Sequence, residues 1–135
     1  MTAWVGIREI SSGKMTCANA GHEYPAVCQN GRFSLLKDRH GFVLGGMEES
    51  KYREYPIQLK KGDKIFVYTD GVPEATNKES ALFGTQRMLE AMNRNTVLSP
   101  KELVGTVRDA VDAFVGDAEQ FDDLTMLCLE YKGTE

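Results

Sequence analysis

Short apolar runs separated by turn residues fill the first half of the chain. Their β-branched and aromatic content and their short length are typical of strands. The strongest turn signal is Asn30-Gly31, a dipeptide that favours a two-residue hairpin loop because both positions tolerate positive φ. The pattern predicts antiparallel strands at residues 3–10, 15–20, 26–29, 32–36 and 55–59, the last of them half-exposed or at a sheet edge.

Two further apolar runs each adjoin acidic residues. Residues 64–69 lead into Asp70-Gly71, whereas Asp122-Asp123 precedes the run at residues 124–131. If these two strands pair side by side in antiparallel orientation, Asp70 and Asp122 leave the sheet at the same end. Clustered carboxylates repel one another, and a hard divalent cation is the usual means of offsetting that repulsion.

Two helices are expected between these acidic strands. Thr85 can cap the first, which is predicted at residues 86–95. Its core-facing side is expected to carry Met88, Leu89 and Met92. The second begins with a capping box at residues 99–102, with proline at its first helical position, and ends at Gly116. Strands followed by two helices and a last strand predict an α+β fold, with helices packed on antiparallel β-sheet layers.

Composition adds limits to this picture. With 135 residues, 41% of them apolar, the chain is expected to form one domain with its own core. Its net charge of −4 argues against nucleic-acid binding, and it shows neither a membrane span nor a signal peptide. We interpret Cys17, Cys28 and Cys128 as reduced core thiols of a cytoplasmic protein rather than as zinc ligands.

Each candidate residue also has a simpler interpretation. Asp-Gly is a common turn dipeptide, and Asp122-Asp123 could cap a turn or be solvated. Glu74 fits a solvated loop acid, and His22 fits a surface or packing residue. The sequence contains no local Ser-His-Asp arrangement and no phosphate-binding or dinucleotide-binding glycine motif. The case for a site therefore depends on the two acidic pairs meeting in space.

A series of motifs resembles the SpoIIE/RsbU branch of the metal-dependent, PPM-type (type 2C) serine/threonine phosphatases. Their order and spacing agree over essentially the whole chain. The motifs are Asn19-Ala20-Gly21-His22-Glu23-Tyr24-Pro25, Gly41 to Gly45, Leu59-Lys60-Lys61-Gly62-Asp63, Tyr68-Thr69-Asp70-Gly71-Val72-Pro73-Glu74-Ala75, Phe83-Gly84 and Asp122-Asp123-Leu124-Thr125.

The resemblance implies an activity and a metal site. Such enzymes hold a binuclear Mg²⁺ or Mn²⁺ centre with aspartates, and a metal-bound water attacks the phosphorus of a phosphoserine or phosphothreonine. By motif, Asp70 and Asp122 correspond to catalytic, metal-binding aspartates, and Asp123 corresponds to an auxiliary metal ligand. The residues expected to support these ligands without binding the metal are Gly71, Asn19 and His22.

One part of the family's pattern is missing. Its first acidic motif, a Gly-Gly-Asp followed shortly by another Asp, supplies the carboxylate that bridges the two metals, and residues 1–135 lack it. We therefore expect a partial phosphatase domain with weak or no metal binding and weak or no activity on its own. Missing strands would also leave a sheet edge uncovered, which predicts a dimer or higher oligomer.

These inferences lead to three candidate functions. The first is a protein phosphatase domain whose substrate, by resemblance, is a small phosphorylated regulator of the anti-anti-sigma type, in the control of transcription or stress response. The second is a non-catalytic, phosphatase-like module that binds a regulator or mediates assembly. The third is a structural cation-binding domain.

Overall fold

Two antiparallel sheets and two helices make up the fold, in a computed structural model that describes residues 3–9, 11–20, 22–36, 54–118 and 124–133. The strands are β1 (Ala3–Arg8), β2 (Lys14–Ala20), β3 (Ala26–Gln29), β4 (Arg32–Leu35), β5 (Glu54–Gln58), β6 (Lys64–Tyr68) and β7 (Met126–Glu130). The helices are α1 (Gly84–Asn93) and α2 (Pro100–Val115). One sheet has the order β1-β2-β5 and the other β4-β3-β6-β7. The α+β fold class predicted from the sequence is confirmed.

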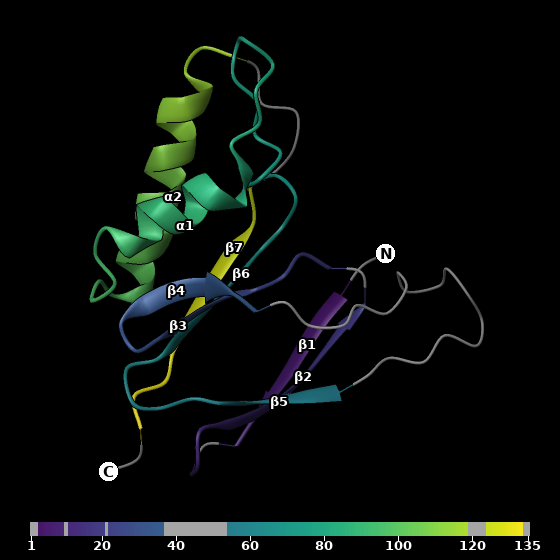
Figure 1. Ribbon diagram of the computed structural model, residues 1–135, viewed down its shortest axis with the longest axis vertical. Coiled ribbons are helices and arrows are strands. Elements are labelled where there is room, and N and C mark those ends of the chain that lie inside the picture. The colour runs from purple at the N-terminus through teal and green to yellow at the C-terminus, as the bar shows by residue number, and fades with distance from the viewer. Residues whose placement is uncertain (1–2, 10, 21, 37–53, 119–123, 134–135) are drawn as a thin grey trace, which may run out of the picture.

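The sheets and helices form three layers. Both helices cover one face of the four-stranded sheet, and the three-stranded sheet lies against its other face (Figure 1). Side chains of β6 alternate between the two cores: Phe66 and Tyr68 belong to the core under the helices, whereas Ile65 belongs to the core between the sheets. A continuous apolar run suits β6 because both of its faces are covered.

The β3–β4 hairpin forms at the predicted turn. Asn30 and Gly31 have φ values of 55° and 75°, as a two-residue loop between twisted antiparallel strands requires. Gly13 has a similar role in the β1–β2 connection. Its φ is +75°, and a Cβ at this position would collide with the Leu59 carbonyl oxygen. Glycine is therefore needed there for both backbone conformation and space.

The start of α2 follows the sequence prediction. The Ser99 side chain accepts a hydrogen bond from the Glu102 N–H, and the Glu102 side chain accepts one from the Ser99 N–H, both at 3.2 Å. This reciprocal pair is the predicted capping box. Gly116 ends the helix, with its N–H donated to the Asp112 carbonyl oxygen. In the part of the chain that the structure describes, neither helix has the length and apolar character needed to cross a lipid bilayer.

The predicted cap of α1 is wrong. The helix begins at Gly84, so Thr85 lies inside its first turn, and among the described residues no side chain caps it. The residue before the helix is Phe83, which is buried and packs edge-to-face on Phe114 of α2 with ring centroids 5.6 Å apart. The packing of Phe83 on Phe114 thus contributes to where this helix starts. The capping preferences of single residues do not include such tertiary contacts.

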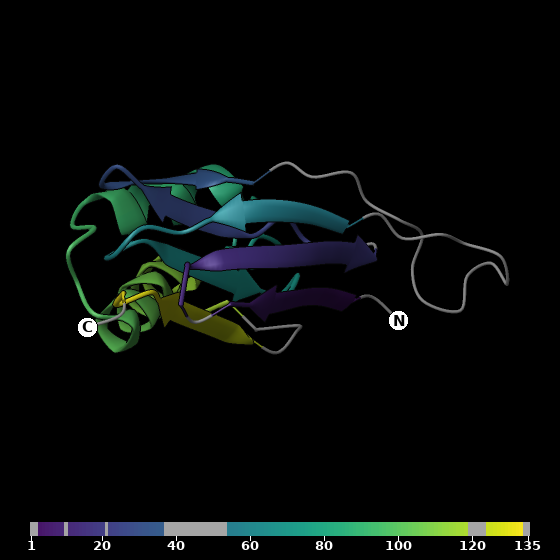
Figure 2. The same ribbon diagram turned by 90° about the horizontal axis from the view of Figure 1, so that it is seen from below.

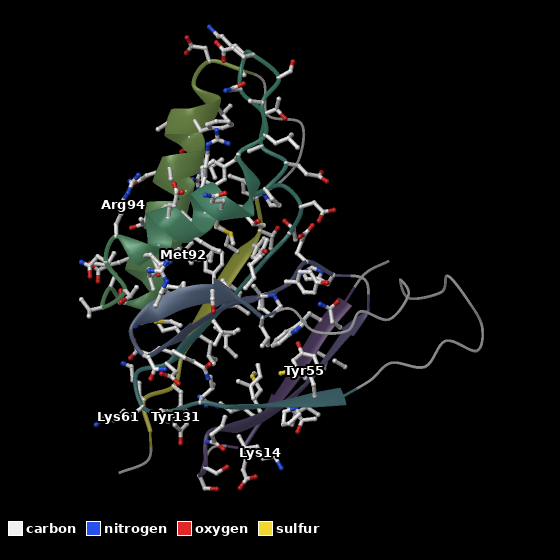
Figure 3. All side chains as sticks on the ribbon, in the orientation of Figure 1. Lys14, Tyr55, Lys61, Met92, Arg94 and Tyr131 are labelled. Atoms are coloured by element: carbon white, nitrogen blue, oxygen red, sulfur yellow. The ribbon has the colours of Figure 1, made fainter. Side chains whose placement is uncertain are left out.

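Asn93 ties α1 to the edge of the four-stranded sheet. Its Oδ1 accepts a hydrogen bond from the Phe33 N–H at 2.7 Å, and its Nδ2 donates to the Phe33 carbonyl oxygen at 3.1 Å. The side-chain amide thus takes the place of a neighbouring strand at this point of β4. Met92 points from α1 toward the sheet, whereas Arg94, just beyond the helix, points away (Figure 3). The predicted core stripe of Met88, Leu89 and Met92 is confirmed.

The three cysteines are thiols rather than disulfides, as the sequence predicts. Cys17 and Cys28 are buried, and Cys128 is half-buried. Burial raises the pKa of the Cys128 thiol to about 11. Because the thiolate is the reactive form, this cysteine contributes to packing rather than to chemistry at neutral pH.

Replacing Asn93 by alanine should lower the free energy of unfolding by about 1–3 kcal/mol, because two backbone groups of Phe33 lose their partners. Urea unfolding followed by circular dichroism measures the change. Asn95→Ala is the matched control, since Asn95 accepts a local, exposed bond from the Val97 N–H at 3.2 Å. Equal losses in both variants would contradict the role given to Asn93.

Candidate metal centre

β6 and β7 are neighbours in the four-stranded sheet and pair antiparallel over their whole length. This is the pairing predicted from the two acid-bearing runs. Beyond the last strand pair, the Thr69 N–H donates to the Thr125 carbonyl oxygen at 3.0 Å, and the Thr125 N–H donates to Thr69 Oγ1 at 3.3 Å. The chain therefore leaves β6 beside the point where it enters β7 (Figure 1), and Asp70 is the second residue after β6.

A tight turn follows β6 and presents Asp70. The Asp70 carbonyl oxygen accepts a hydrogen bond from the Glu74 N–H at 2.9 Å, and the Thr69 carbonyl oxygen accepts one from the Val72 N–H at 3.1 Å. Gly71 and Val72 are buried, whereas Asp70 is exposed. The turn thus anchors the backbone in the fold and leaves the carboxylate accessible to a ligand from solvent.

The second acidic pair remains a prediction. Asp122 and Asp123 lie outside the described residues, as does the glycine-containing segment at residues 41–46. Within the described ranges, no three Asp, Glu, His or Cys side chains form a cluster that could hold a metal ion. Glu74 is exposed, which agrees with its interpretation as a solvated acid. The meeting of Asp70 with Asp122 therefore rests on the strand pairing alone.

Asn19 shapes the loop between β2 and β3. Its side chain is buried, and its Oδ1 accepts a hydrogen bond from the His22 N–H at 2.8 Å. At the far end of the loop, the Pro25 carbonyl oxygen accepts a hydrogen bond from the Leu36 N–H at 2.8 Å. The backbone is thus held at both ends of this loop. The predicted support of the metal ligands by Asn19, His22 and Gly71 remains a prediction.

Glu23 lies in this loop and is not among the site residues that the sequence predicts. β3 and β6 pair antiparallel with Ala26 opposite Phe66, and continuing that register places Glu23 opposite Thr69, one residue from Asp70. The carboxyl groups of Glu23 and Asp70 lie within hydrogen-bonding reach of each other. Glu23 could be identified because it lies just before β3, a strand that pairs with β6. That pairing joins distant parts of the chain, so no local sequence pattern reveals it.

The contact with Asp70 changes the ionisation of Glu23. Burial, then the hydrogen bond to Asp70 and the negative charges of Asp70 and Glu74, raise the pKa of the Glu23 carboxyl to about 7. Two carboxyl groups in hydrogen-bond contact cannot both ionise without strong repulsion. A proton or a cation between them would relieve this repulsion.

Tyr68 is buried close to this pair. It is 2% exposed, and among the described residues its hydroxyl has no hydrogen-bond partner. Burial raises the pKa of the hydroxyl, and the negative charges of Glu23 and Asp70 raise it further. A buried hydroxyl without a partner is unfavourable, and an ion or its water at the two carboxyls would satisfy it. These oxygen donors fit a hard cation such as Mg²⁺ or Mn²⁺.

Comparison with known families identifies the class of protein to which this fold belongs. Residues 1–132 match the family described as Stage II sporulation protein E (SpoIIE). The chain belongs to the SpoIIE family.

Two relatives show the extent of the similarity in sequence. Phosphoserine phosphatase RsbU of Bacillus subtilis (strain 168) is 28% identical over 122 residues, which cover 88% of this chain and 35% of RsbU. Protein IcfG of Synechocystis sp. (strain ATCC 27184 / PCC 6803 / Kazusa) is 27% identical over 128 residues, which cover 95% of this chain and 20% of IcfG. The chain thus spans about a third or less of the length of these relatives.

A solved structure shows the extent of the similarity in fold. The phosphatase domain of the cell fate determinant SpoIIE from Bacillus subtilis superposes with a TM-score of 0.77 at 15% identity, over 99% of this chain and 60% of that chain. A manganese-presoaked form of the same domain gives a TM-score of 0.76. The 135 residues therefore have the fold of part of a PP2C-type phosphatase domain.

Asn19→Ala should lower the free energy of unfolding by about 1–3 kcal/mol, because the His22 N–H loses its acceptor in a buried setting. Thermal and urea unfolding measure the loss. Asn77→Ala is the control, since Asn77 accepts bonds from the Glu79 and Ala81 N–H groups in an exposed loop, where water can replace it. An Asn19 variant as stable as the wild type would show that this bond does not hold the loop.

Proposed function

We propose that the chain is part of a metal-dependent protein phosphatase domain that removes phosphate from phosphoserine or phosphothreonine. One observation carries the proposal: Asp70 lies in the turn that follows the inner strand β6 as an exposed carboxylate, close to the start of β7. The segment before β7 contains Asp122 and Asp123. Family membership supports phosphatase chemistry for this arrangement.

The proposed site would hold Mg²⁺ or Mn²⁺ through Asp70 and Asp122, with Asp123 as an auxiliary ligand. When bound, such ions neutralise phosphate charge and lower the pKa of a coordinated water. The remaining groups belong to the protein itself. The turn after β6 holds the Asp70 backbone rigidly, and the Asn19-anchored loop places Glu23 against the Asp70 carboxylate. Rigid placement of charged groups is the main contribution that a protein makes to phosphoryl transfer.

The substrate that we propose is a small phosphorylated regulatory protein of the anti-anti-sigma type, encountered in the cytoplasm. The name of RsbU, a phosphoserine phosphatase, supports a phosphoserine-containing substrate. The exposure of Asp70 at the end of a sheet also supports it, because a phosphorylated loop of a folded protein can reach a carboxylate in that position.

A non-catalytic binding module is the second candidate. One observation favours it: residues 1–135 contain no Gly-Gly-Asp motif of the kind that supplies the family's bridging carboxylate. A phosphatase-like domain with an incomplete metal site would still present the same surface to a phosphorylated partner. Such a domain would bind the regulator without turning it over.

The test compares the 135 residues alone with the longest open reading frame that contains them, on p-nitrophenyl phosphate and on a phosphoserine protein. The longer protein should release phosphate only with Mn²⁺, and Asp70→Asn should lower the rate by about 100-fold or more. The 135 residues alone should stay close to the blank. Turnover by the longer protein that survives EDTA or Asp70→Asn would refute the proposal. Binding without turnover in both proteins would favour the second candidate.

We also propose that the chain associates with a second copy of itself through the side of the molecule where β1 and β7 are edge strands. In the described part of the chain, β1 and β7 end their sheets on the same side of the molecule (Figure 2). An apolar pocket of about 320 Å³ lies between them, with Trp4, Leu127 and Leu129 among its lining residues. Ile7 on β1 and Leu127 on β7 are 72% and 66% exposed. Edge strands that expose apolar side chains tend to pair with another strand.

Light scattering coupled to gel filtration at high micromolar concentration should therefore show a dimer or larger assembly. Ile7→Lys places a charge on the β1 edge and should shift the protein toward the monomer. Val97→Lys is the matched control, because Val97 is 85% exposed in the connection between α1 and α2, away from both edges. A wild-type protein that stays monomeric contradicts the proposal.

A further inference from the structure

Glu23 and Asp70 come from different loops and meet at one end of the four-stranded sheet. The Glu23 loop runs directly into β3, Asp70 follows β6, and β3 and β6 are antiparallel neighbours. Strand pairing therefore brings the two carboxyl groups into hydrogen-bond contact. Holding two acids together is unfavourable unless something positively charged lies between them. A bound cation would therefore explain why the fold brings these two carboxyl groups together.

The backbone that carries Glu23 is held facing the Asp70 turn. Asn19 binds the loop at His22, and the Pro25 carbonyl oxygen binds Leu36. Pro25 is also among the fully buried residues. These contacts hold the backbone on both sides of Glu23.

Tyr68 gives a second, independent indication of a ligand. Its hydroxyl is fully buried and has no hydrogen-bond partner within the described residues. Only Thr69 separates Tyr68 from Asp70 in the chain. The negative charges of Glu23 and Asp70 both act on this hydroxyl, so it lies near the pair. Buried polar atoms are almost always paired in native proteins. A cation or its water between the carboxylates would provide the missing partner.

We propose that Glu23 binds a divalent cation together with Asp70, with the Tyr68 hydroxyl turned toward the same ion or its water. The ion belongs to the hard, oxygen-preferring class of Mg²⁺ and Mn²⁺. The inference deepens the proposed function and rests on it, because it places Glu23 in the same metal centre as Asp70. Glu23 thereby supplies a carboxylate from the β2–β3 loop to a site whose other acids adjoin β6 and β7.

Mn²⁺ titration of the longer protein that contains these 135 residues, followed by the electron paramagnetic resonance signal of free Mn²⁺, tests the inference. Glu23→Gln should raise the dissociation constant about tenfold or more, and Glu23→Asp should retain more of the affinity. Glu74→Gln is the matched control, since it removes the same charge from an exposed position in the same turn. Thermal unfolding of each variant without Mn²⁺ shows that it is folded.

The outcomes separate this inference from the proposed function. If Asp70→Asn abolishes Mn²⁺ binding and Glu23→Gln leaves it unchanged, the role of Glu23 is overturned and the proposed function stands. Equal weakening by Glu23→Gln and Glu74→Gln also overturns it, because general electrostatics would then explain the effect. If the wild type does not bind Mn²⁺ at millimolar concentration, or if Asp70→Asn binds as well as the wild type, the proposed metal site and this inference both fail.

Discussion

The antiparallel pairing of β6 with β3 on one side and β7 on the other is the constraint on which the rest of the structure depends. β6 lies inside the four-stranded sheet, and its side chains enter both hydrophobic cores. The same two pairings determine which loops surround its end. β3 brings the Glu23 loop to Asp70, and β7 brings the segment that leads into Thr125. Stability and the candidate site therefore share one element.

The apolar content of β6 explains how the fold tolerates repulsive groups at its end. Phe66 and Tyr68 stack with ring centroids 5.9 Å apart under the helices, and Ile65 packs between the sheets. Fully burying side chains of this size contributes about 1.5–3 kcal/mol each relative to leaving them exposed. Like-charged carboxyl contacts weaken a fold by amounts of similar size. A strand buried on both faces can therefore hold a destabilised acidic pair in place.

Local structure was predictable wherever it depends on neighbouring residues. The Asn30-Gly31 hairpin and the Ser99–Glu102 capping box both form as the sequence predicts. Each depends on a few adjacent residues, so its signal is complete in a short window. The start of α1 shows the limit of such reasoning. Packing of Phe83 on Phe114 determines where that helix begins, and this contact joins residues that are far apart in the chain.

The candidate site divides in the same way. Asp70 was predictable because an acid followed by glycine at the end of an apolar run is visible in a local stretch of sequence. Its partners Glu23 and Tyr68 were not, since no local pattern distinguishes Glu23 from other loop acids or shows that the Tyr68 hydroxyl is buried without a partner.

Taken by itself, the sequence determined the strands, the hairpin, the second helix and the acidic strand end, because propensity, turn chemistry and hydrophobic period act over a few residues. Only the tertiary structure decided that the Glu23 loop meets the Asp70 turn and where α1 begins. Those features depend on which strands become neighbours and which side chains fill the space between them. That choice minimises the free energy of the whole molecule and cannot be read from any one segment.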